Sequence, residues 1–357
     1  MVRPSIRVAV FAGAGASCFA GLPTVCSFFK RAGWPPSHGF EAACQEIARR
    51  ISISEANEEN LAWPDFDAEK LFGWLEILER AGRIHGQSID IHVPNLRFTI
   101  PADAVISHLR KEIVRIYGSK LATETLLSAP HQSLFKLLDD LTPRSDPLYV
   151  FTTNYDTVLE QLFEDAATSQ QVFRHKLRVC TGFSSARPGQ WQPALLSEKP
   201  KSDERLIHLV KLHGSATWKR DDAQQPIETG WRMPTDQDCL LYFGYKSVPE
   251  HEPFFTLHTL LKIALLQCEA VIVIGFRVAD PYIRELFDFA LRSNTSLRVV
   301  CSLTRPPEPN SALSTMMHRF PGRVVLLADP SGKPIPFGHE SFPEILEQSL
   351  RNAGTVG

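Results

Sequence analysis

Residues 6–17 of the chain are IRVAVFAGAGAS, a short aliphatic run that ends in two closely spaced glycines. Such a run is typical of a buried parallel strand that enters a tight turn. We therefore expect a strand over 6–12 and a helix over 22–32. Glycines placed directly after a first strand also let the backbone approach a ligand closely, and the helix start offers free N–H groups.

Similar buried runs recur along the chain, and helical patterns separate several of them. Further strands are expected at 148–152, 207–212, 270–274, 297–301 and 323–327. Helices are expected at 155–165, 280–292 and 310–319. This alternation of strand and helix predicts an α/β fold with a Rossmann-like, doubly wound parallel sheet.

Two stretches interrupt this alternation. Residues 33–142 carry apolar side chains at helical spacing without buried strands between them, which predicts an inserted helical subdomain. The helices expected in this insertion are 70–81, 104–117 and 131–141. Residues 1–32 plus 143–357 then form the Rossmann-like core. A second, polar interruption at 219–253 is a small excursion with one expected strand, at 239–243.

The composition excludes several classes of protein. With 357 residues, 43% hydrophobic and 22% charged, the chain is globular and long enough for roughly two domains. The 38 Lys and Arg against 40 Asp and Glu leave no basic excess that would indicate nucleic acid or an anionic membrane.

The location of the protein is predicted from its cysteines and its uncharged segments. Seven scattered cysteines without a C-x-x-C pair indicate a reducing compartment. The uncharged run 8–22 contains Gly13, Gly15 and Gly21, which argue against a helical secretory signal, and no other run is long enough to span a membrane. We expect a cytoplasmic protein.

Two sequence motifs with chemical character lie at the ends of expected strands, where open α/β sheets bind ligands. The first is the glycine motif of residues 13–17, whose spacing differs from that of dehydrogenases because Cys18 stands at the third glycine position. The second is TTNYD at residues 152–156. Its Asn154 and Asp156 either face a ligand or cap the helix that follows.

Two more motifs follow later strands. In KLHGS, at residues 211–215, His213 is either a general base at the mouth of the strand or a structural histidine. In IGFR, at residues 274–277, Arg277 either pairs with a phosphate or lies at the surface. A separate acidic cluster at residues 65–69 either binds a metal ion or begins a helix, and its spacing favours the helix start.

In this order, the motifs resemble those of the sirtuin superfamily. The matching segments are GAGAS at 13–17, GLP at 21–23, TTNYD at 152–156, HG at 213–214 and Gly275. The resemblance implies that Asn154 and Asp156 face the nicotinamide ribose of NAD and that His213 is the catalytic base. It further implies an NAD-binding set formed by Gly13, Ala14, Gly15, Ser17, Thr153, Gly275 and Arg277.

The chain also departs from the protein-deacylase branch of that superfamily. Deacylases carry D-F-R after the G-L-P motif, whereas residues 24–26 here are TVC. Only Cys239 and Cys268 lie between His213 and Gly275, so two C-x-x-C zinc pairs are impossible and no metal is expected. Where the family has G-T-S, Arg277 replaces the serine. These departures resemble the zinc-free, sirtuin-like NADases of prokaryotic antiviral defence.

The resemblance therefore implies an NAD glycohydrolase that releases nicotinamide and ADP-ribose, or cyclic ADP-ribose. Two alternatives remain open: a protein deacylase or ADP-ribosyl transferase that uses the same residues, and a non-catalytic module that senses NAD or ADP-ribose. The expected partners are NAD, a second copy of the chain, and an activating protein such as a helicase-type ATPase or a short Argonaute. Neither a membrane nor a nucleic acid is an expected partner.

Overall fold

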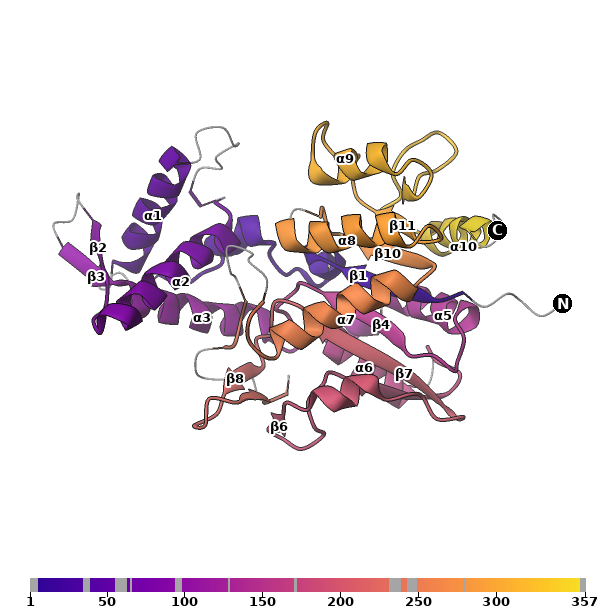
Figure 1. Ribbon diagram of the computed structural model, residues 1–357, viewed down its shortest axis with the longest axis horizontal. Coiled ribbons are helices and arrows are strands. Elements are labelled where there is room, and N and C mark those ends of the chain that lie inside the picture. Colours follow the sequence, from indigo (N-terminus) through magenta and orange to yellow (C-terminus); the bar gives the residue numbers. More distant parts are fainter. Residues whose placement is uncertain are drawn as a thin grey trace.

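The chain forms a seven-stranded, fully parallel sheet in the computed structural model, in the order β12-β11-β10-β1-β4-β7-β5 (Figure 1). Its strands are β1 (Val8–Ala12), β4 (Leu148–Thr152), β5 (Lys176–Cys180), β7 (Glu204–Lys211), β10 (Ala270–Ile274), β11 (Arg298–Ser302) and β12 (Val324–Leu326). The structure describes residues 6–34, 39–54, 63–64, 66–93, 98–127, 129–169, 172–230, 239–242, 249–278 and 280–353. The central strands are short and buried, as a parallel sheet covered on both faces requires.

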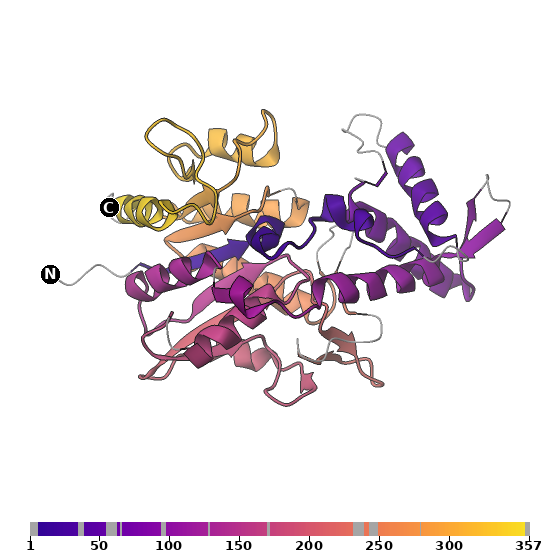
Figure 2. The same ribbon diagram turned by 180° about the vertical axis from the view of Figure 1, so that it is seen from behind.

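Helices cover both faces of the sheet, which confirms the predicted doubly wound α/β fold. One layer contains α5 (His131–Leu141), α6 (Val158–Ser169) and α10 (Phe342–Ala353). The other contains α7 (Phe254–Gln267), α8 (Pro281–Ser293) and α9 (Ala312–Arg319). Figures 1 and 2 show the molecule from these two opposite sides. Alternation along β1 sends Val8 and Val10 to the first layer and Ala9 and Phe11 to the second.

The connections of the sheet reverse direction beside β1. The chain runs from β1 to β4 on one side, and later from β10, on the other side of β1, to β11. Adjacent strands whose connections lead in opposite directions leave a crevice beyond their carboxyl ends, which is the usual ligand position in such sheets. The glycine motif after β1 and Gly275 after β10 both lie at this switch point.

A helical unit extends from one end of the sheet (Figure 2), and its core also includes Tyr155, Ala216, Cys239 and Leu241 from the Rossmann-like part of the chain. The helical unit contains α1 (Phe40–Ser54), α2 (Ala68–His85), the hairpin β2 (Asp90–Val93) and β3 (Phe98–Pro101), and α3 (Ala102–Tyr117). The hairpin was not expected within the predicted insertion of residues 33–142. The later helix α5 packs its apolar face on the main sheet, so the helical unit ends near Tyr117.

The predicted strands at 148–152 and 270–274 agree with β4 and β10 residue by residue, and those at 297–301 and 323–327 differ from β11 and β12 by one residue at each end. The expected helix over 22–32 is wrong. Gly21, at φ +70°, ends a 3₁₀ helix over Ala14–Ala20, and a second 3₁₀ helix covers Val25–Lys30. A left-handed residue stops helix propagation at that point.

The region 219–253 contributes to a small antiparallel sheet. Its strands are β6 (Gly189–Gln190), β8 (Trp218–Arg220) and β9 (Pro226–Glu228). The strand expected at 239–243 is wrong for its described part, where Leu241 makes only an isolated bridge with Gly214. Phe243 lies outside the described residues. The edge strand β5 was missed because its mixture of exposed and buried positions gives no continuous apolar run.

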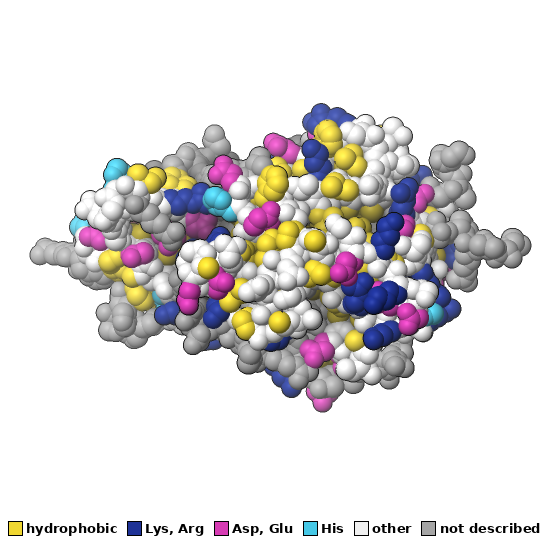
Figure 3. All heavy atoms as spheres, turned by 60° about the horizontal axis from the view of Figure 1, so that its bottom comes forward, with side chains coloured by type: hydrophobic (Ala, Val, Ile, Leu, Met, Phe, Trp, Pro, Cys, Tyr) yellow, Lys and Arg dark blue, Asp and Glu magenta, His cyan; other side chains and the backbone are white. Residues whose placement is uncertain are grey.

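No helix in the described ranges is both long and apolar enough to cross a membrane. The face shown in Figure 3 carries Lys, Arg, Asp and Glu side chains interspersed with apolar ones. Among the residues described on that face, the charges therefore form no continuous basic surface of the kind that attracts nucleic acid.

His131 is a buried histidine whose two ring nitrogens have no hydrogen-bond partner in the described part of the chain. It stands at the start of α5, and its ring packs against Phe19 and Phe337 at centroid distances of 5.2 and 4.6 Å. Burial lowers the pKa of His131 from 6.5 to about 3. The folded state therefore holds this side chain neutral where the unfolded chain protonates it.

Replacing His131 with leucine should make the protein less sensitive to acid. Between pH 6.5 and about 3 the unfolded chain binds a proton that the folded His131 does not, so stability falls as the pH falls. The free energy of unfolding of His131→Leu minus that of the parent should increase by ~1.4 kcal/mol for each unit by which the pH is lowered from 6 to 4. Urea denaturation measures both free energies. Leu134→Met, equally buried but not titratable, is the control, and a pH-independent difference for His131→Leu would contradict the assignment.

Candidate active site

Two glycine loops meet backbone to backbone at the switch point. The amide of Gly13 donates to Ile274 O at 2.8 Å, and that of Gly15 donates to Gly275 O at 3.1 Å. A Cβ on Gly13 would lie 2.7 Å from Gly275 O, and one on Gly15 would lie 2.6 Å from Gly275 Cα. Gly275 itself adopts φ +61°. The glycines of both predicted motifs are therefore required by this close contact, whether or not a ligand is bound.

Asn154 connects the loop after β4 to the glycine loop after β1. Its Nδ2 donates to Gly13 O and to Ser17 Oγ, each at 3.0 Å. Its own amide N–H is held by Thr152 Oγ1 at 3.0 Å, which fixes the turn at the end of the strand. Two motifs that lie 141 residues apart in the sequence are thus joined by a single side chain.

Asp156 lies beside this junction and is buried. Its Oδ1 accepts from the amide of Val158 at 3.0 Å, so it caps α6, as the structural alternative predicted. Burial raises the pKa of Asp156, although Lys211, the Val158 amide, Ser17 and Asn154 all oppose that shift. The Asp156 carboxyl group therefore lies beside Ser17 and Asn154, at the junction of the loops after β1 and β4.

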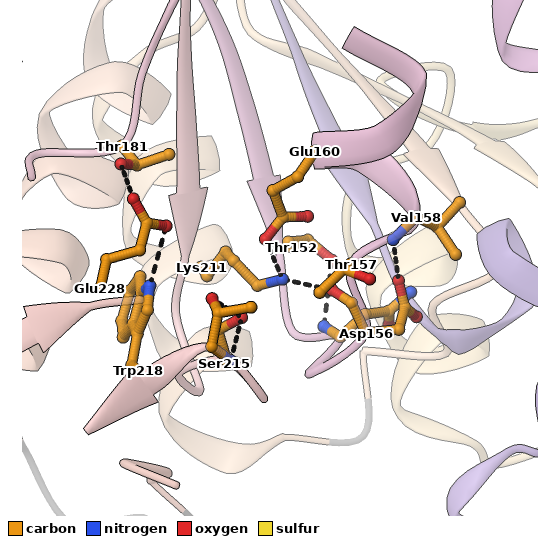
Figure 4. A network of polar contacts seen from close by, with 12 residues as sticks. Thr152, Asp156, Thr157, Val158, Glu160, Thr181, Lys211, Ser215, Trp218 and Glu228 are labelled. Atoms are coloured by element: carbon orange, nitrogen blue, oxygen red, sulfur yellow. Dashed lines mark hydrogen bonds and ion pairs between the residues drawn. The ribbon is translucent and has the colours of Figure 1, made fainter. Parts of the chain in front are cut away.

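Lys211, at the end of β7, supplies a buried positive charge next to Asp156 (Figure 4). Its Nζ lies 2.7 Å from Glu160 Oε1 and also donates to the backbone oxygen of Asp156. Only 1% of its side chain is exposed. A buried ion pair with a further hydrogen bond fixes the ends of β4 and β7 relative to each other, because losing one partner strands a charge.

His213 follows β7 and is buried, with 2% of its side chain exposed. Its Nε2 lies 3.1 Å from Asp280 Oδ2, and its Nδ1 lies 3.6 Å from Glu69 Oε1. Burial alone lowers the pKa of His213, but the hydrogen bond to Asp280 and the negative charges of Asp280 and Glu69 outweigh it and raise that pKa. The next residue, Gly214, turns the chain at φ +88°.

The two carboxylates beside His213 come from different parts of the fold. Asp280 precedes α8 and caps it, because Oδ1 accepts from the amides of Tyr282 and Ile283 at 2.9 and 3.1 Å. Glu69 belongs to α2 of the helical unit, and its Oε1 accepts from the Tyr155 hydroxyl at 2.9 Å. Tyr155 adjoins Asn154, so the two halves of the site share a segment.

The other predicted site residues take varied positions. Ala14 begins the first 3₁₀ helix, and Thr153 is buried with its amide donating to Ala12 O at 3.3 Å. Arg277 is exposed beyond the end of β10. Between Gly275 and Asp280, Val278 is fully buried at φ +55°, a conformation that β-branched residues rarely adopt.

The sequence analysis missed Glu69, Lys211 and Asp280 as members of this site. Asp280 had a detectable signal, because Asp-Pro is a typical start of a helix. No sequence signal indicated Glu69 as a site residue, because its position depends on how the helical unit packs against the sheet. Asp67 caps α2 through Oδ1, which accepts from the Glu69 amide at 2.8 Å, so the helix-start interpretation holds there. Asp65 lies outside the described residues.

Asp156, His213 and Asp280 are buried, whereas 19% of the Glu69 side chain is exposed. A cavity of about 10 Å³, room for about one water molecule, adjoins Glu69 and Tyr155. A larger recess of about 1240 Å³ lies between the helical unit and the small sheet and is lined by other residues. Across the described residues, no group of three or more His, Cys, Asp and Glu side chains has an arrangement that could hold a metal ion.

Part of the chain matches a known protein family. Residues 149–318 match the family model of the SIR2-like domain. The match supports a relationship between this part of the chain and the sirtuin superfamily. It covers slightly under half of the 357 residues and includes Asn154, Asp156, His213 and Gly275, but not the glycine loop. No curated protein matches the chain.

Solved sirtuin structures align with nearly the whole chain at low identity. A Sir2 homologue–NAD complex is 11% identical over 97% of this chain and 90% of its own, with a TM-score of 0.41. A second structure, described as the structural basis for the mechanism and regulation of Sir2 enzymes, is 13% identical to this chain. The alignment covers 98% of this chain and 94% of the other, also with a TM-score of 0.41. The fold class follows from the sheet order of the chain itself.

Exchanging Gly15 for alanine should disrupt the contact between the two glycine loops. The new Cβ meets backbone atoms of Gly275, which cannot rotate away, so we expect the free energy of unfolding to fall by about 1–3 kcal/mol. Thermal unfolding measures the change. Gly33→Ala is the matched control: neither glycine has a positive φ, but the Cβ position of Gly33 lies 3.4 Å from its nearest neighbour, Glu112 Oε2, an ordinary van der Waals contact, so its loss should be smaller. Equal losses would contradict a steric role for Gly15.

Proposed function

We propose that this chain is an NAD glycohydrolase that cleaves the nicotinamide–ribose bond. One observation carries the proposal: Asn154 bridges the glycine loop through Gly13 and Ser17 at the switch point of the sheet. The site thereby combines a candidate pyrophosphate-binding loop with an asparagine and an aspartate at the position where a bound ribose would lie. The SIR2-like family match over residues 149–318 supports the same assignment.

The chemistry of NAD suits this set of residues. Nicotinamide leaves as a neutral group from a positively charged ring nitrogen, so cleavage needs no general acid, unlike ordinary glycoside hydrolysis. Both N–H bonds of the Asn154 amide are used by Gly13 and Ser17, which leaves Oδ1 to accept a hydrogen bond from a ribose hydroxyl or from water. Asp156 would support positive charge on the ribose, and His213 would accept the proton.

Gly13, Ala14, Gly15, Ser17, Thr153, Gly275 and Arg277 are proposed to hold the rest of NAD. The glycine loop would bind the pyrophosphate through backbone amides, and the exposed Arg277 would supply a positive charge near a phosphate. No metal has a role in this scheme. Water as the acceptor gives ADP-ribose, whereas an internal acceptor gives cyclic ADP-ribose.

The enzymatic alternative is a deacylase or ADP-ribosyl transferase that passes the ribose to a peptide. It would use the same Asn154 and His213, but the D-F-R segment and the cysteine pairs of deacylases are absent from the sequence. The non-enzymatic alternative is a sensor of NAD or ADP-ribose, for which a general base would be unnecessary.

An enzyme that depletes NAD has to be silent until it is triggered. We propose that the chain is an effector of prokaryotic antiviral defence, controlled by self-association or by an activating protein such as a helicase-type ATPase or a short Argonaute. Size-exclusion chromatography of the chain alone and with products of neighbouring genes tests this arrangement. A chain that remains monomeric and binds none of them would contradict it.

The reaction itself is tested by incubating the purified chain with NAD and separating nicotinamide, ADP-ribose and cyclic ADP-ribose by chromatography. His213→Ala and Asn154→Ala should each lower nicotinamide release at least about a hundredfold, because each removes a group proposed to act on the reacting atoms. Circular dichroism should show both variants folded, with lowered thermal midpoints because each loses buried contacts.

His85→Ala is the matched control, since His85 is exposed at the end of α2 and is expected to leave the rate unchanged. Cleavage at the parent rate by Asn154→Ala or His213→Ala would refute the assignment. Nicotinamide release only in the presence of an acylated peptide would favour the deacylase instead.

A further inference from the structure

Both ring nitrogens of His213 face carboxylates. Asp280 Oδ2 lies 3.1 Å from Nε2 and Glu69 Oε1 lies 3.6 Å from Nδ1, and the ring is 2% exposed. A histidine acts as a general base only when one nitrogen carries a lone pair directed at the proton that it removes. In this structure, neither nitrogen is directed toward open space.

The two carboxylates differ in how firmly the fold holds them. Asp280 is 3% exposed, and its other oxygen accepts from two amides at the start of α8, so it is fixed by the main core. Its contact leaves the Nε2 proton in place and orients the ring. Nδ1 is then the nitrogen that can act as the base, and Glu69 occupies the position beside it.

Glu69 reaches this position from the helical unit. It lies in the first turn of α2, next to Ala68, Leu71 and Phe72, which belong to the core of that unit. The Tyr155 hydroxyl, at 2.9 Å, holds the same Oε1 atom that faces His213. Only 2% of the His213 side chain is exposed and Glu69 Oε1 lies 3.6 Å from its Nδ1, so a ribose cannot reach Nδ1 while Glu69 stays in place.

We propose that the inserted helical unit holds the enzyme in a resting state by placing Glu69 against Nδ1 of His213, and that cleavage requires α2 to withdraw. This inference rests on the proposed NAD glycohydrolase function. Asp280 is a positioning residue in both states, whereas Glu69 has to leave for the substrate to enter. Any activating protein that pulls on the helical unit would then release the base.

The surroundings of His213 agree with a charged ring in the resting state. Besides Asp280 and Glu69, its neighbours are Tyr155, Tyr242 and His258. Burial and the positive charge of His213 lower the pKa of His258 to about 4, so this second ring stays neutral. The two carboxylates therefore face one imidazolium, and removing Glu69 should make that imidazolium more acidic.

The test compares Glu69→Ala, Glu69→Gln and Tyr155→Phe with the parent in full-length protein. Both Glu69 substitutions remove the carboxylate charge that lies beside Nδ1 of His213. Tyr155→Phe removes the hydroxyl that holds Glu69 but keeps the charge of Glu69. NAD cleavage at pH 7 should rise about tenfold in Glu69→Ala, a size typical of coupling between a switch element and a site. The matched control is Glu79→Gln on the same helix, because Glu79 pairs with Arg110 at 3.4 Å.

A second readout does not depend on activity. In ¹⁵N-labelled protein, the His213 signals are identified among the 12 histidines by their loss in His213→Asn. The titration midpoint of His213 should move to lower pH in Glu69→Ala and Glu69→Gln. The acidic limb of the rate profile should move in the same direction, because the neutral base then exists at lower pH.

Two results would overturn the proposal. An unchanged His213 midpoint in both Glu69 variants would show that Glu69 does not act on the ring, whatever the rates are. Loss of cleavage in Glu69→Ala as complete as in His213→Ala would make Glu69 part of the catalytic machinery instead of a block. If no protein cleaves NAD with or without an activating protein but the midpoint moves as expected, the glycohydrolase function is refuted and the contact between Glu69 and His213 is supported.

Discussion

The contact between the two glycine loops at the switch point is the constraint on which the site depends. Gly15 and Gly275 approach so closely that neither could carry a Cβ, and this approach holds the loops after β1 and β10 against each other. Asn154 can reach Gly13 only because the loop after β1 is held there. The loop that begins at Gly275 leads to Asp280, which orients His213. A single backbone contact thus places both halves of the site.

The sequence predicted the sheet well because its central strands are continuous buried aliphatic runs, as β4 and β10 show. The resemblance assigned Asn154 and Ser17 to one candidate NAD site, and a hydrogen bond joins the two side chains in the structure. The edge strand β5 and the hairpin β2–β3 were missed because their side chains are only partly buried, so the apolar pattern is weak. The contact of Glu69 with His213 depends on packing between distant elements, which no local pattern encodes.

Two clusters of buried charge lie on either side of the segment 154–156. One contains Lys211 and Glu160 beside Asp156, and the other contains His213 between Asp280 and Glu69. Burying such groups is costly unless their charges are paired. In the first cluster all the partners come from the main core. In the second, one partner comes from the helical unit, so the cost of opening the site depends on the position of α2.

The two carboxylate oxygens of Asp280 bind different groups. Oδ1 satisfies amides at the start of α8, and Oδ2 holds the ring of His213. The start of α8 and the orientation of His213 therefore depend on the same carboxylate, and we expect only residues that can do both to replace Asp280 without loss. Arg277 is exposed and can be replaced without loss to the core, whereas Asp280 would be needed to start α8 even in a relative without catalytic activity. The presence of this aspartate in a relative would then be evidence of a stable α8, and not by itself of an active enzyme.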